Sequence, residues 1–325
     1  MPPARHLRQR PCARENHLVT TLSVVIVSYN TRELLRMCLA SVLRAGPTEV
    51  TVVDNASADD SAKMVQADFP QVRLIASEQN LGFVRANNLA LGESHGDHLL
   101  LLNPDAELQE GALSTLQGFL DARPRAGAVG PRLVYGDGAL QHAAFRFPTL
   151  LQTYFDFFPW PARLLQSTVN GRYPLTAYSG QPFQVDFVLG ACLMIRRAAM
   201  EQVGLLDERY FMYCEEMDWC KRLGQAGWGV WCEPGAVVVH REAQSSRQTR
   251  WPSYVEKWRS RFIFYERYYP AWWRMINRQI VRAGLGAGAR RAKSAHRRGE
   301  ITSDELAQSF EAFRQVARLS AASAG

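Results

Sequence analysis

The stretch LLNPDAEL, residues 101–108, decides the fold when it is read together with VVDNAS, residues 52–57. In both stretches an apolar run with strand character ends in acidic and amide side chains. Asp54 closes the first run, and Asp105 follows the second by three residues. Open α/β sheets bind their ligands at the carboxyl ends of parallel strands. Oxygen ligands in that position predict a site for a hard divalent cation and a nucleotide.

Strand and helix patterns alternate around these two stretches. A continuous apolar, β-branched run predicts a buried strand at residues 22–28, and further strands are predicted at residues 48–54, 72–77 and 98–103. Residues 31–45, between the first two runs, carry apolar side chains at helical spacing. Such alternation is typical of βαβ units. We therefore expect an α/β fold with a mostly parallel central sheet flanked by helices.

Charge is distributed unevenly along the 325 residues. The formal net charge is +7, yet residues 241–300 alone hold fifteen Lys and Arg against four Asp and Glu, a local balance of +11. The rest of the chain is therefore net negative, and its basicity belongs to the C-terminal segment. No apolar run reaches the roughly 18 residues needed to span a bilayer. The basic first 20 residues lack the apolar core of a signal peptide.

The six cysteines form no CxxC pair and no zinc-binding spacing. Most lie in apolar or aromatic text, which favours buried free thiols over disulfides and fits a reducing cytoplasm. Residues 135–182 are rich in aromatic residues and proline without clear periodicity, and predict a functional loop or lid. The predicted segments are a disordered leader (1–20), an α/β domain (21–245, with halves 21–134 and 135–245), a basic aromatic helical segment (246–283), and a linker with a short helix (284–325).

The first candidate site residues follow the strands at the expected ligand edge. Ser28 and Asn30 could bind a base or ribose, or could only cap the next helix. Asp54 could accept from a base N–H or a ribose hydroxyl, or could form an Asx-turn. Asn80 and Gly82 lie where a loop enters a helix that carries Asn87, and a helix-start loop without ligand is the alternative.

Two further groups complete the candidate set. Asp105 could ligate Mg²⁺ or Mn²⁺, which in turn would hold a diphosphate, or could cap the following helix. Glu215, Glu216 and Asp218 open a helix, and one of them could act as a general base. Acids in a first turn are also favoured by the helix dipole alone. His240, after a buried strand, could be a metal ligand or a structural histidine.

Taken in order, these elements resemble the inverting family 2 glycosyltransferases, and within them a bacterial rhamnosyltransferase-like branch. The matching text is VVIVSYN (24–30), VVDNAS (52–57), NLGFVRANN (80–88), LLNPDAEL (101–108), GACLMIRR (190–197), YCEEMDWCKRLGQAGW (213–228) and VVVHREAQSS (237–246). The resemblance implies the GT-A fold, which is a nucleotide-diphosphate-binding α/β domain with a variable acceptor side.

The resemblance also implies roles for individual residues. Asp54 resembles the family's nucleobase-binding Asp, and Asp105 the last Asp of its metal-binding DxD. The sequence departs from that motif at Asn103, which stands where the first Asp would be. Glu216 matches the usual catalytic base, although the family carries the shorter Asp there, so Glu215 and Asp218 remain alternatives. His240 matches a histidine found after the last strand in metal-dependent relatives.

The implied reaction is a single displacement with inversion at the anomeric carbon. The donor would be a nucleotide diphosphate sugar, with rhamnose as the guess, and the acceptor a hydroxyl of a glycan or lipid-linked glycan in cell-surface polysaccharide synthesis. The cofactor would be Mg²⁺ or Mn²⁺. Aromatic residues interleaved with cations in WPSYVEKWRSRFIFYERYYPAWWRMINRQIVR (251–282) fit an anionic membrane surface at the inner face of the plasma membrane, or plain packing on the domain. Nucleic acid is the least favoured partner.

Two rival functions differ in testable features. A sugar-phosphate nucleotidyltransferase should carry a glycine-rich basic loop after its first strand, where this chain has SYNTREL (28–34). A nonenzymatic nucleotide-sugar-binding module would keep the fold with a degenerate site, and Asn103 and Glu216 are the features that favour it. A dinucleotide-dependent enzyme is disfavoured because no GxGxxG follows a strand.

Overall fold

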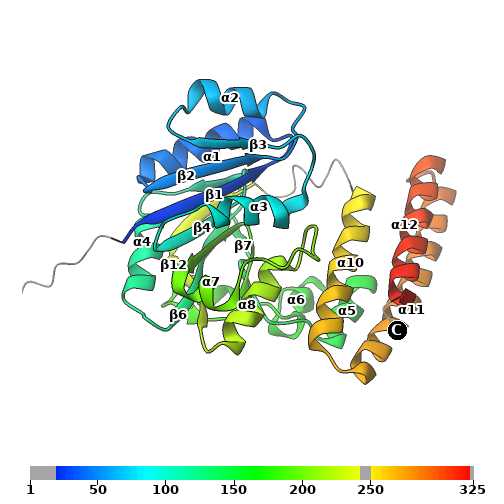
Figure 1. The fold of residues 1–325 in the computed structure, drawn as a ribbon. Helices are drawn as coiled ribbons and strands as arrows, with labels where there is room; N and C mark the ends of the chain where they lie inside the picture. The colour runs from blue at the N-terminus through cyan, green and yellow to red at the C-terminus, as the bar shows by residue number, and fades with distance from the viewer. Residues whose placement is uncertain (1–19, 242–249, 323–325) are drawn as a thin grey trace, which may run out of the picture.

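The computed structural model describes residues 20–241 and 250–322. An α/β body carries a separate layer of long C-terminal helices at one side (Figure 1). The predicted leader (1–20) lies almost wholly outside the described residues. The predicted boundary between residues 245 and 246 lies outside them as well.

One large sheet forms the centre of the body. Its strands follow the order β3-β2-β1-β4-β11-β6-β12-β5. The bounds are β1 Leu22–Ser28, β2 Glu49–Asp54, β3 Arg73–Ala76, β4 His98–Leu102, β5 Ala106–Leu108, β6 Ala126–Val134, β11 Cys192–Arg196 and β12 Gly229–His240. The short strands β7 (Leu140–Gln141) and β9 (Phe183–Gln184) pair with β6 and β12, and β8 (Ala144–Phe145) pairs with β10 (Phe187–Val188). Strand β1 is wholly buried, as its unbroken apolar run predicts.

The sheet is mixed, whereas the sequence predicted a mostly parallel one. Strands β3, β2, β1 and β4 are parallel neighbours, as the βαβ alternation predicts. Strand β11 then runs antiparallel to both β4 and β6. The connection that reverses the chain lies in the aperiodic part of the sequence, where strand direction cannot be read. The parallel set still brings Ser28 and Asp54 side by side in register at one edge.

Helices cover the sheet and bury its apolar faces. They are α1 (Arg32–Ala45), α2 (Ser61–Asp68), α3 (Gly82–Gly92), α4 (Ala112–Asp121), α7 (Arg197–Val203) and α8 (Glu215–Gln225). Helix α3 packs on β1 and β2, and α4 packs on β6 and β12. The five cysteines of the described residues are free and buried, as expected.

Residues 135–182, predicted as a functional loop or lid, form short helices and strands that contact the central sheet and the C-terminal helices. Helix α5 (Leu150–Phe157) begins with a capping box in which Thr149 and Gln152 satisfy each other's backbone N–H groups. The remainder is a short helix, α6 (Ala162–Leu165), and two 3₁₀ turns. The Asn277 amide donates to Thr153 Oγ1 at 2.7 Å, which fastens α5 to the C-terminal helices.

The C-terminal layer consists of α10 (Arg250–Tyr268), α11 (Ala271–Arg297) and α12 (Ser303–Ala322) (Figure 1). Residues 284–297, predicted as a linker, are helical and continue α11. The ring of Phe157 in α5 occupies the space that a Cβ at Gly284 would fill, so the close packing of α5 on α11 requires glycine there. No helix among the described ranges is long and apolar enough to cross a membrane.

Candidate active site

Asp54 is the last residue of β2, and only one of its two carboxylate oxygens accepts a hydrogen bond. The side chain is 3% exposed. Oδ1 accepts the Ser57 N–H at 3.0 Å, which is the predicted Asx-turn, whereas buried Oδ2 has no hydrogen-bond partner. A buried unsatisfied oxygen requires an explanation. The turn therefore leaves a preformed acceptor for a ligand N–H or hydroxyl.

Ser28 and Asn30 shape the neighbouring loop with their side chains. Ser28 Oγ is buried and lies 3.0 Å from Thr31 Oγ1. Asn30 adopts a left-handed backbone (φ 53°), and its Oδ1 accepts the Ala58 N–H at 2.7 Å. Tyr29, which the sequence analysis did not consider, is 40% exposed between them. Its ring is thus the part of this loop that is open to a ligand.

Asn55 holds the Asn80–Gly82 loop beside Asp54, and the sequence analysis missed it. Its Nδ2 donates to Asn80 Oδ1 at 2.9 Å and to the Gly82 carbonyl at 3.2 Å, and its Oδ1 accepts the Leu81 N–H at 2.8 Å. The sequence signal for this role is the side-chain amide of Asn55, directly after Asp54. These bonds place Asn80 and Gly82 at the same sheet edge as Asp54.

Gly82 is required by both its backbone and its surroundings. Its φ is +81°, and an added Cβ would lie 2.5 Å from Phe211 Cδ2. The adjacent Phe83 N–H donates to the Phe211 carbonyl at 2.8 Å, which joins the helix to the loop before α8. Asn87 is buried and donates to the Phe83 carbonyl at 2.8 Å. Asn87 thus bonds within its own helix, one turn after Gly82.

Asp105 and His240 lie together, although 134 residues separate them. His240 Nε2 is 3.3 Å from Asp105 Oδ1, and both residues are buried. His240 Nδ1 lies 3.0 Å from Gln141 Oε1. An Nδ1–H donated to that oxygen leaves the Nε2 lone pair directed at Asp105, as a metal-binding imidazole requires. Gln141 comes from the aperiodic segment, which gave no signal for it.

The donor set fits a divalent cation that is shared with a substrate. Across residues 20–241 and 250–322, no group of three or more His, Cys, Asp or Glu could hold an ion by itself. Mg²⁺ sites commonly use one or two protein ligands and complete their shell with water and substrate phosphates. Asn103 supports the turn through its backbone, donating to the Ala191 carbonyl at 2.9 Å and accepting the Ala106 N–H at 3.1 Å.

Glu215 and Glu216 begin α8, each with a buried carboxylate oxygen that has no partner. Burial raises the pKa of both carboxyls, and the charge of Glu216 raises the pKa of Glu215 further. The backbone at Gly190 faces Glu216, since an added Cβ there would lie 3.5 Å from the Glu216 Cβ. A carboxyl with a raised pKa and a free oxygen is suited to accept a proton near neutral pH.

The turn that presents these acids is strained. Tyr213 and Cys214 are consecutive residues with left-handed backbones, φ 70° and 65°, and neither is glycine. Each such residue costs on the order of 1–3 kcal/mol unless surrounding structure fixes it. Ser260 of α10 supplies one fixing contact by donating to the Met212 carbonyl at 2.7 Å. The C-terminal layer therefore helps to hold the start of α8.

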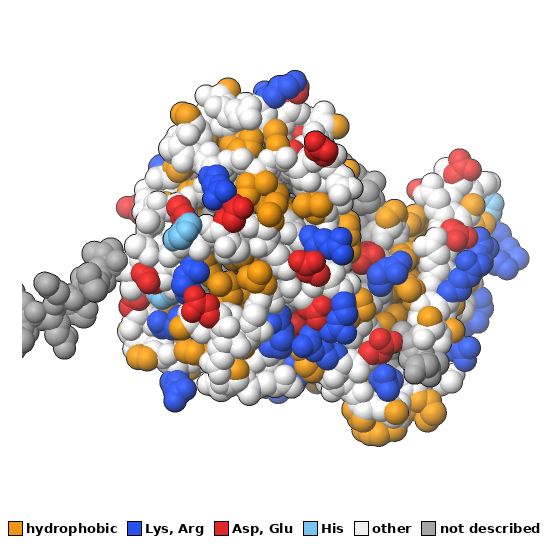
Figure 2. Space-filling view, in the orientation of Figure 1, with side chains coloured by type: hydrophobic (Ala, Val, Ile, Leu, Met, Phe, Trp, Pro, Cys, Tyr) orange, Lys and Arg blue, Asp and Glu red, His pale blue; other side chains and the backbone are white. Residues whose placement is uncertain are grey.

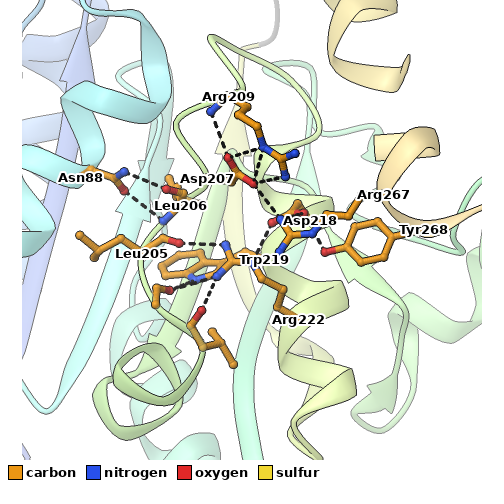
Figure 3. A network of polar contacts seen from close by, with 12 residues as sticks. Asn88, Leu205, Leu206, Asp207, Arg209, Asp218, Trp219, Arg222, Arg267 and Tyr268 are labelled. Carbon is orange, nitrogen blue, oxygen red and sulfur yellow. Dashed lines mark hydrogen bonds and ion pairs between the residues drawn. The ribbon is translucent and has the colours of Figure 1, made fainter. Parts of the chain in front are cut away.

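Asp218, the third candidate base, lies in a buried ion-pair network (Figure 3). It is 0% exposed and accepts from Arg222 Nε at 2.7 Å, from Arg267 Nη1 at 3.0 Å and from the Tyr268 hydroxyl at 2.8 Å. Arg267 also reaches Asp207 at 2.7 Å. These contacts engage the Asp218 carboxylate fully and join α8 to α10, so its position indicates a structural role.

The chain is similar in sequence to known glycosyltransferases. The family model described as glycosyl transferase family 2 matches residues 23–204. An N-acetylglucosaminyl-diphospho-decaprenol L-rhamnosyltransferase of Mycobacterium tuberculosis is 32% identical over 289 residues, covering 82% of this chain and 91% of that protein. A dTDP-rhamnosyl transferase of Shigella flexneri is 24% identical and covers 68% of this chain and 69% of its own length.

A solved mannosyltransferase of Pyrobaculum calidifontis, in complex with GDP-mannose and Mn²⁺, matches the fold. Its TM-score is 0.55 at 16% identity, with 93% of this chain and 84% of that chain covered. The fold is therefore of the GT-A type, as the sequence resemblance implied. The rival readings as a nucleotidyltransferase and as a nonenzymatic module give way to an enzyme that transfers glycosyl groups. The chain belongs to glycosyl transferase family 2.

Proposed function

We propose that this glycosyltransferase is metal-dependent and inverting, and that it moves a sugar from a nucleotide diphosphate donor to a hydroxyl of a lipid-linked glycan. The observation that carries the proposal is the continuity of the site through Gly190 and Ala191. Gly190 faces Glu216, and the next residue, Ala191, accepts the backbone N–H of Asn103 in the turn that holds Asp105. A base and a metal ligand are thus joined by two residues of backbone.

Glu216 is the proposed catalytic base. The proton of the acceptor hydroxyl passes to its carboxylate as the acceptor oxygen bonds to the anomeric carbon on the face opposite the leaving group. The bond between that carbon and the donor phosphate oxygen breaks, and its electron pair leaves with the nucleoside diphosphate. Asp54 Oδ2 accepts from the nucleotide. A bound Mg²⁺ or Mn²⁺, held by Asp105 and His240, would neutralise charge on the leaving diphosphate.

The donor and acceptor are proposed from the relatives. Two of them are named for rhamnosyl transfer, and one of those for a diphospho-decaprenol acceptor, so rhamnose and a polyprenyl diphosphate glycan are the first substrates to test. Such an acceptor belongs to cell-surface polysaccharide synthesis. Analysis of the glycosylated product and of the released nucleotide identifies the acceptor and the donor directly.

The acceptor would require the enzyme to work at a membrane surface, and the C-terminal layer offers a contact face. Trp272 and Met275, at the start of α11, are 60% and 58% exposed, and Ile276 lies beside them. Figure 2 has a patch of apolar side chains at the tip where α10 meets α11. With the local excess of Lys and Arg, this tip suits the anionic inner face of the plasma membrane.

Vesicle sedimentation tests the membrane contact. We expect co-sedimentation with anionic vesicles, reduced in Trp272→Ala/Met275→Ala. Leu175→Ser, which changes an apolar residue of similar exposure on the body, is the matched control. Equal sedimentation of the three proteins would contradict the contact.

A donor panel tests the transfer itself. The purified protein is incubated with dTDP-rhamnose, UDP-sugars and GDP-sugars, with and without Mn²⁺, and with a polyprenyl diphosphate GlcNAc acceptor. Metal-dependent transfer from one donor, lost in Asp105→Ala and in Glu216→Gln, supports the proposal. Transfer that persists in Glu216→Gln, or nucleotide binding indifferent to Asp105→Ala, refutes the assigned roles.

A further inference from the structure

A cavity of about 530 Å³ lies in the C-terminal layer, between α5, α10, α11 and α12. This volume is within the range of roughly 300–1,000 Å³ that is typical of ligand pockets. The proposed mechanism uses none of the three long helices that enclose it. The cavity reaches the turn that begins α8, because Tyr213, two residues before Glu215, is one of its lining residues.

The charge of the lining is positive. Arg250, Lys257 and Arg291 contribute cations, against one carboxylate, that of Asp156. Asp156 is itself engaged, since Arg261 donates to it and Lys257 Nζ lies 3.9 Å from Oδ1. The neighbouring Arg261 charge and burial lower the pKa of Lys257, which indicates more positive charge than Asp156 offsets. The cavity thus favours an anion.

The remaining walls are aromatic. Phe313 of α12 makes edge contacts with Trp251 and Tyr254 of α10, at ring-centroid distances of 5.8 and 6.1 Å. On α11, Gly284 and Gly288 let the rings of Phe157 and Phe313 pack closely against the helix, so these rings form the wall on that side. Cations beside broad apolar walls match a ligand with a charged end and a hydrocarbon chain. An anion without a hydrocarbon chain would need only the cations and not the aromatic walls.

Tyr213 connects the cavity to the start of α8, which carries the proposed base. Tyr213 forms a side-chain hydrogen bond with Ser253 of α10, and Glu215 follows two residues later. A ligand in the cavity would therefore sit against the strained turn that presents the catalytic acids. This placement suits the acceptor rather than the donor, whose nucleotide site lies at the β1–β2 edge.

We propose that this cavity binds the diphosphate and the first isoprenoid units of a polyprenyl diphosphate acceptor, with Lys257 and Arg291 on the diphosphate and the aromatic walls along the chain. The inference rests on the proposed function, because it places the acceptor of that reaction. It adds a second anion-binding site, separate from the one at Asp105.

Isothermal titration with farnesyl diphosphate tests the site on the full-length protein. EDTA is present, so that a metal at Asp105 cannot recruit the probe's diphosphate. Inorganic pyrophosphate and farnesol report the charged end and the chain separately. The variants are Lys257→Gln and Arg291→Gln, and Arg290→Gln is the matched control on the same helix, outside the lining. Thermal unfolding of every variant confirms that it folds.

We expect farnesyl diphosphate to bind at least about tenfold more tightly than pyrophosphate, since burying even two methylenes contributes that much. Lys257→Gln and Arg291→Gln should each weaken it about tenfold or more, as loss of a charge-assisted bond predicts. Arg290→Gln and Asp105→Asn should bind as wild type does. Equal binding of pyrophosphate, or unchanged binding in both Lys257→Gln and Arg291→Gln, would overturn the proposal.

Nucleoside diphosphate titration with Mn²⁺ on the same proteins, after removal of EDTA, separates this inference from the proposed function. If that binding fails in the wild type, the proposed function fails. If it is lost only in Asp105→Asn while Lys257→Gln and Arg291→Gln both leave farnesyl diphosphate binding unchanged, the function stands and the acceptor site is refuted.

Discussion

Two acids of α8 two residues apart, Glu216 and Asp218, should respond to amide substitution in opposite ways. In Asp218→Asn, the charge that Arg222 and Arg267 share is removed from a fully buried position. Breaking a buried ion pair by removing one partner costs about 3–5 kcal/mol. Arg267 is one third exposed and keeps Asp207, so the lower end applies, about 3 kcal/mol.

Glu216→Gln should leave stability nearly unchanged. Its free Oε2 has no partner to lose, and burial already raises the pKa of the carboxyl, so a neutral amide is tolerated. We expect a change within about 0.5 kcal/mol of wild type. Turnover should fall by about 10²–10⁴, the usual contribution of a positioned general base.

Urea unfolding monitored by circular dichroism, together with nucleotide release from the donor, measures both quantities. With a denaturant slope of about 3 kcal/mol/M, the Asp218→Asn midpoint should fall by about 1 M. Release per folded molecule should survive in that variant. A wild-type midpoint with abolished turnover in Asp218→Asn, or a midpoint loss with retained turnover in Glu216→Gln, would show the roles to be reversed.

Three further predictions concern other parts of the site. Because folding raises the pKa of the Glu215 carboxyl above 4.5, the stability that this group contributes is complete below pH 4.5 and is lost as the pH rises through its folded-state pKa. The urea midpoint of Glu215→Gln should therefore rise relative to that of wild type as pH increases. A midpoint difference that does not change with pH would contradict this. His240→Ala should raise the Mn²⁺ concentration for half-maximal transfer by about tenfold or more, as loss of a ligand or its support does, which a metal titration checks. Gly82→Ala should lower the free energy of unfolding by about 1–3 kcal/mol for its positive φ, and further because of the clash with Phe211. The loss should exceed that of Gly46→Ala, where φ is +71° and no atom lies within 4 Å of the added Cβ. Equal urea midpoints of the two variants would refute the role of Phe211.

The sheet edge and its acids were predictable because they depend on local pattern. Buried strands are legible as apolar runs; Asp54 is the last residue of one such strand, and Asp105 follows another by three residues. The contact between Asp105 and His240 was expected only through the family resemblance, since residues so far apart meet through the strand order. Gln141 stayed unseen because its segment has no periodicity.

Other features depend on tertiary contacts that no local pattern carries. An acid in a first helical turn satisfies the dipole whichever role it has, and only Arg267 and Tyr268 of α10 identify Asp218 as structural. Glycines at residues 284, 286 and 288 lower helix propensity, so no local pattern marks residues 284–297 as helix. The close approach of Phe157, which requires a glycine at residue 284, is visible only in the folded structure.

The contact between Ser260 and the Met212 carbonyl limits how this enzyme can be re-engineered. Chimeras that graft the helices of a relative onto this α/β body, in order to change the acceptor, would sever that bond unless the donor helix carries a hydroxyl at the same place. The family match ends at residue 204, before the strained turn, so an exchanged segment that starts there would carry the turn, Glu216 and α10 together but would leave behind Gly190, which faces Glu216. The segments exchanged in such chimeras should therefore begin before Gly190 and include α10.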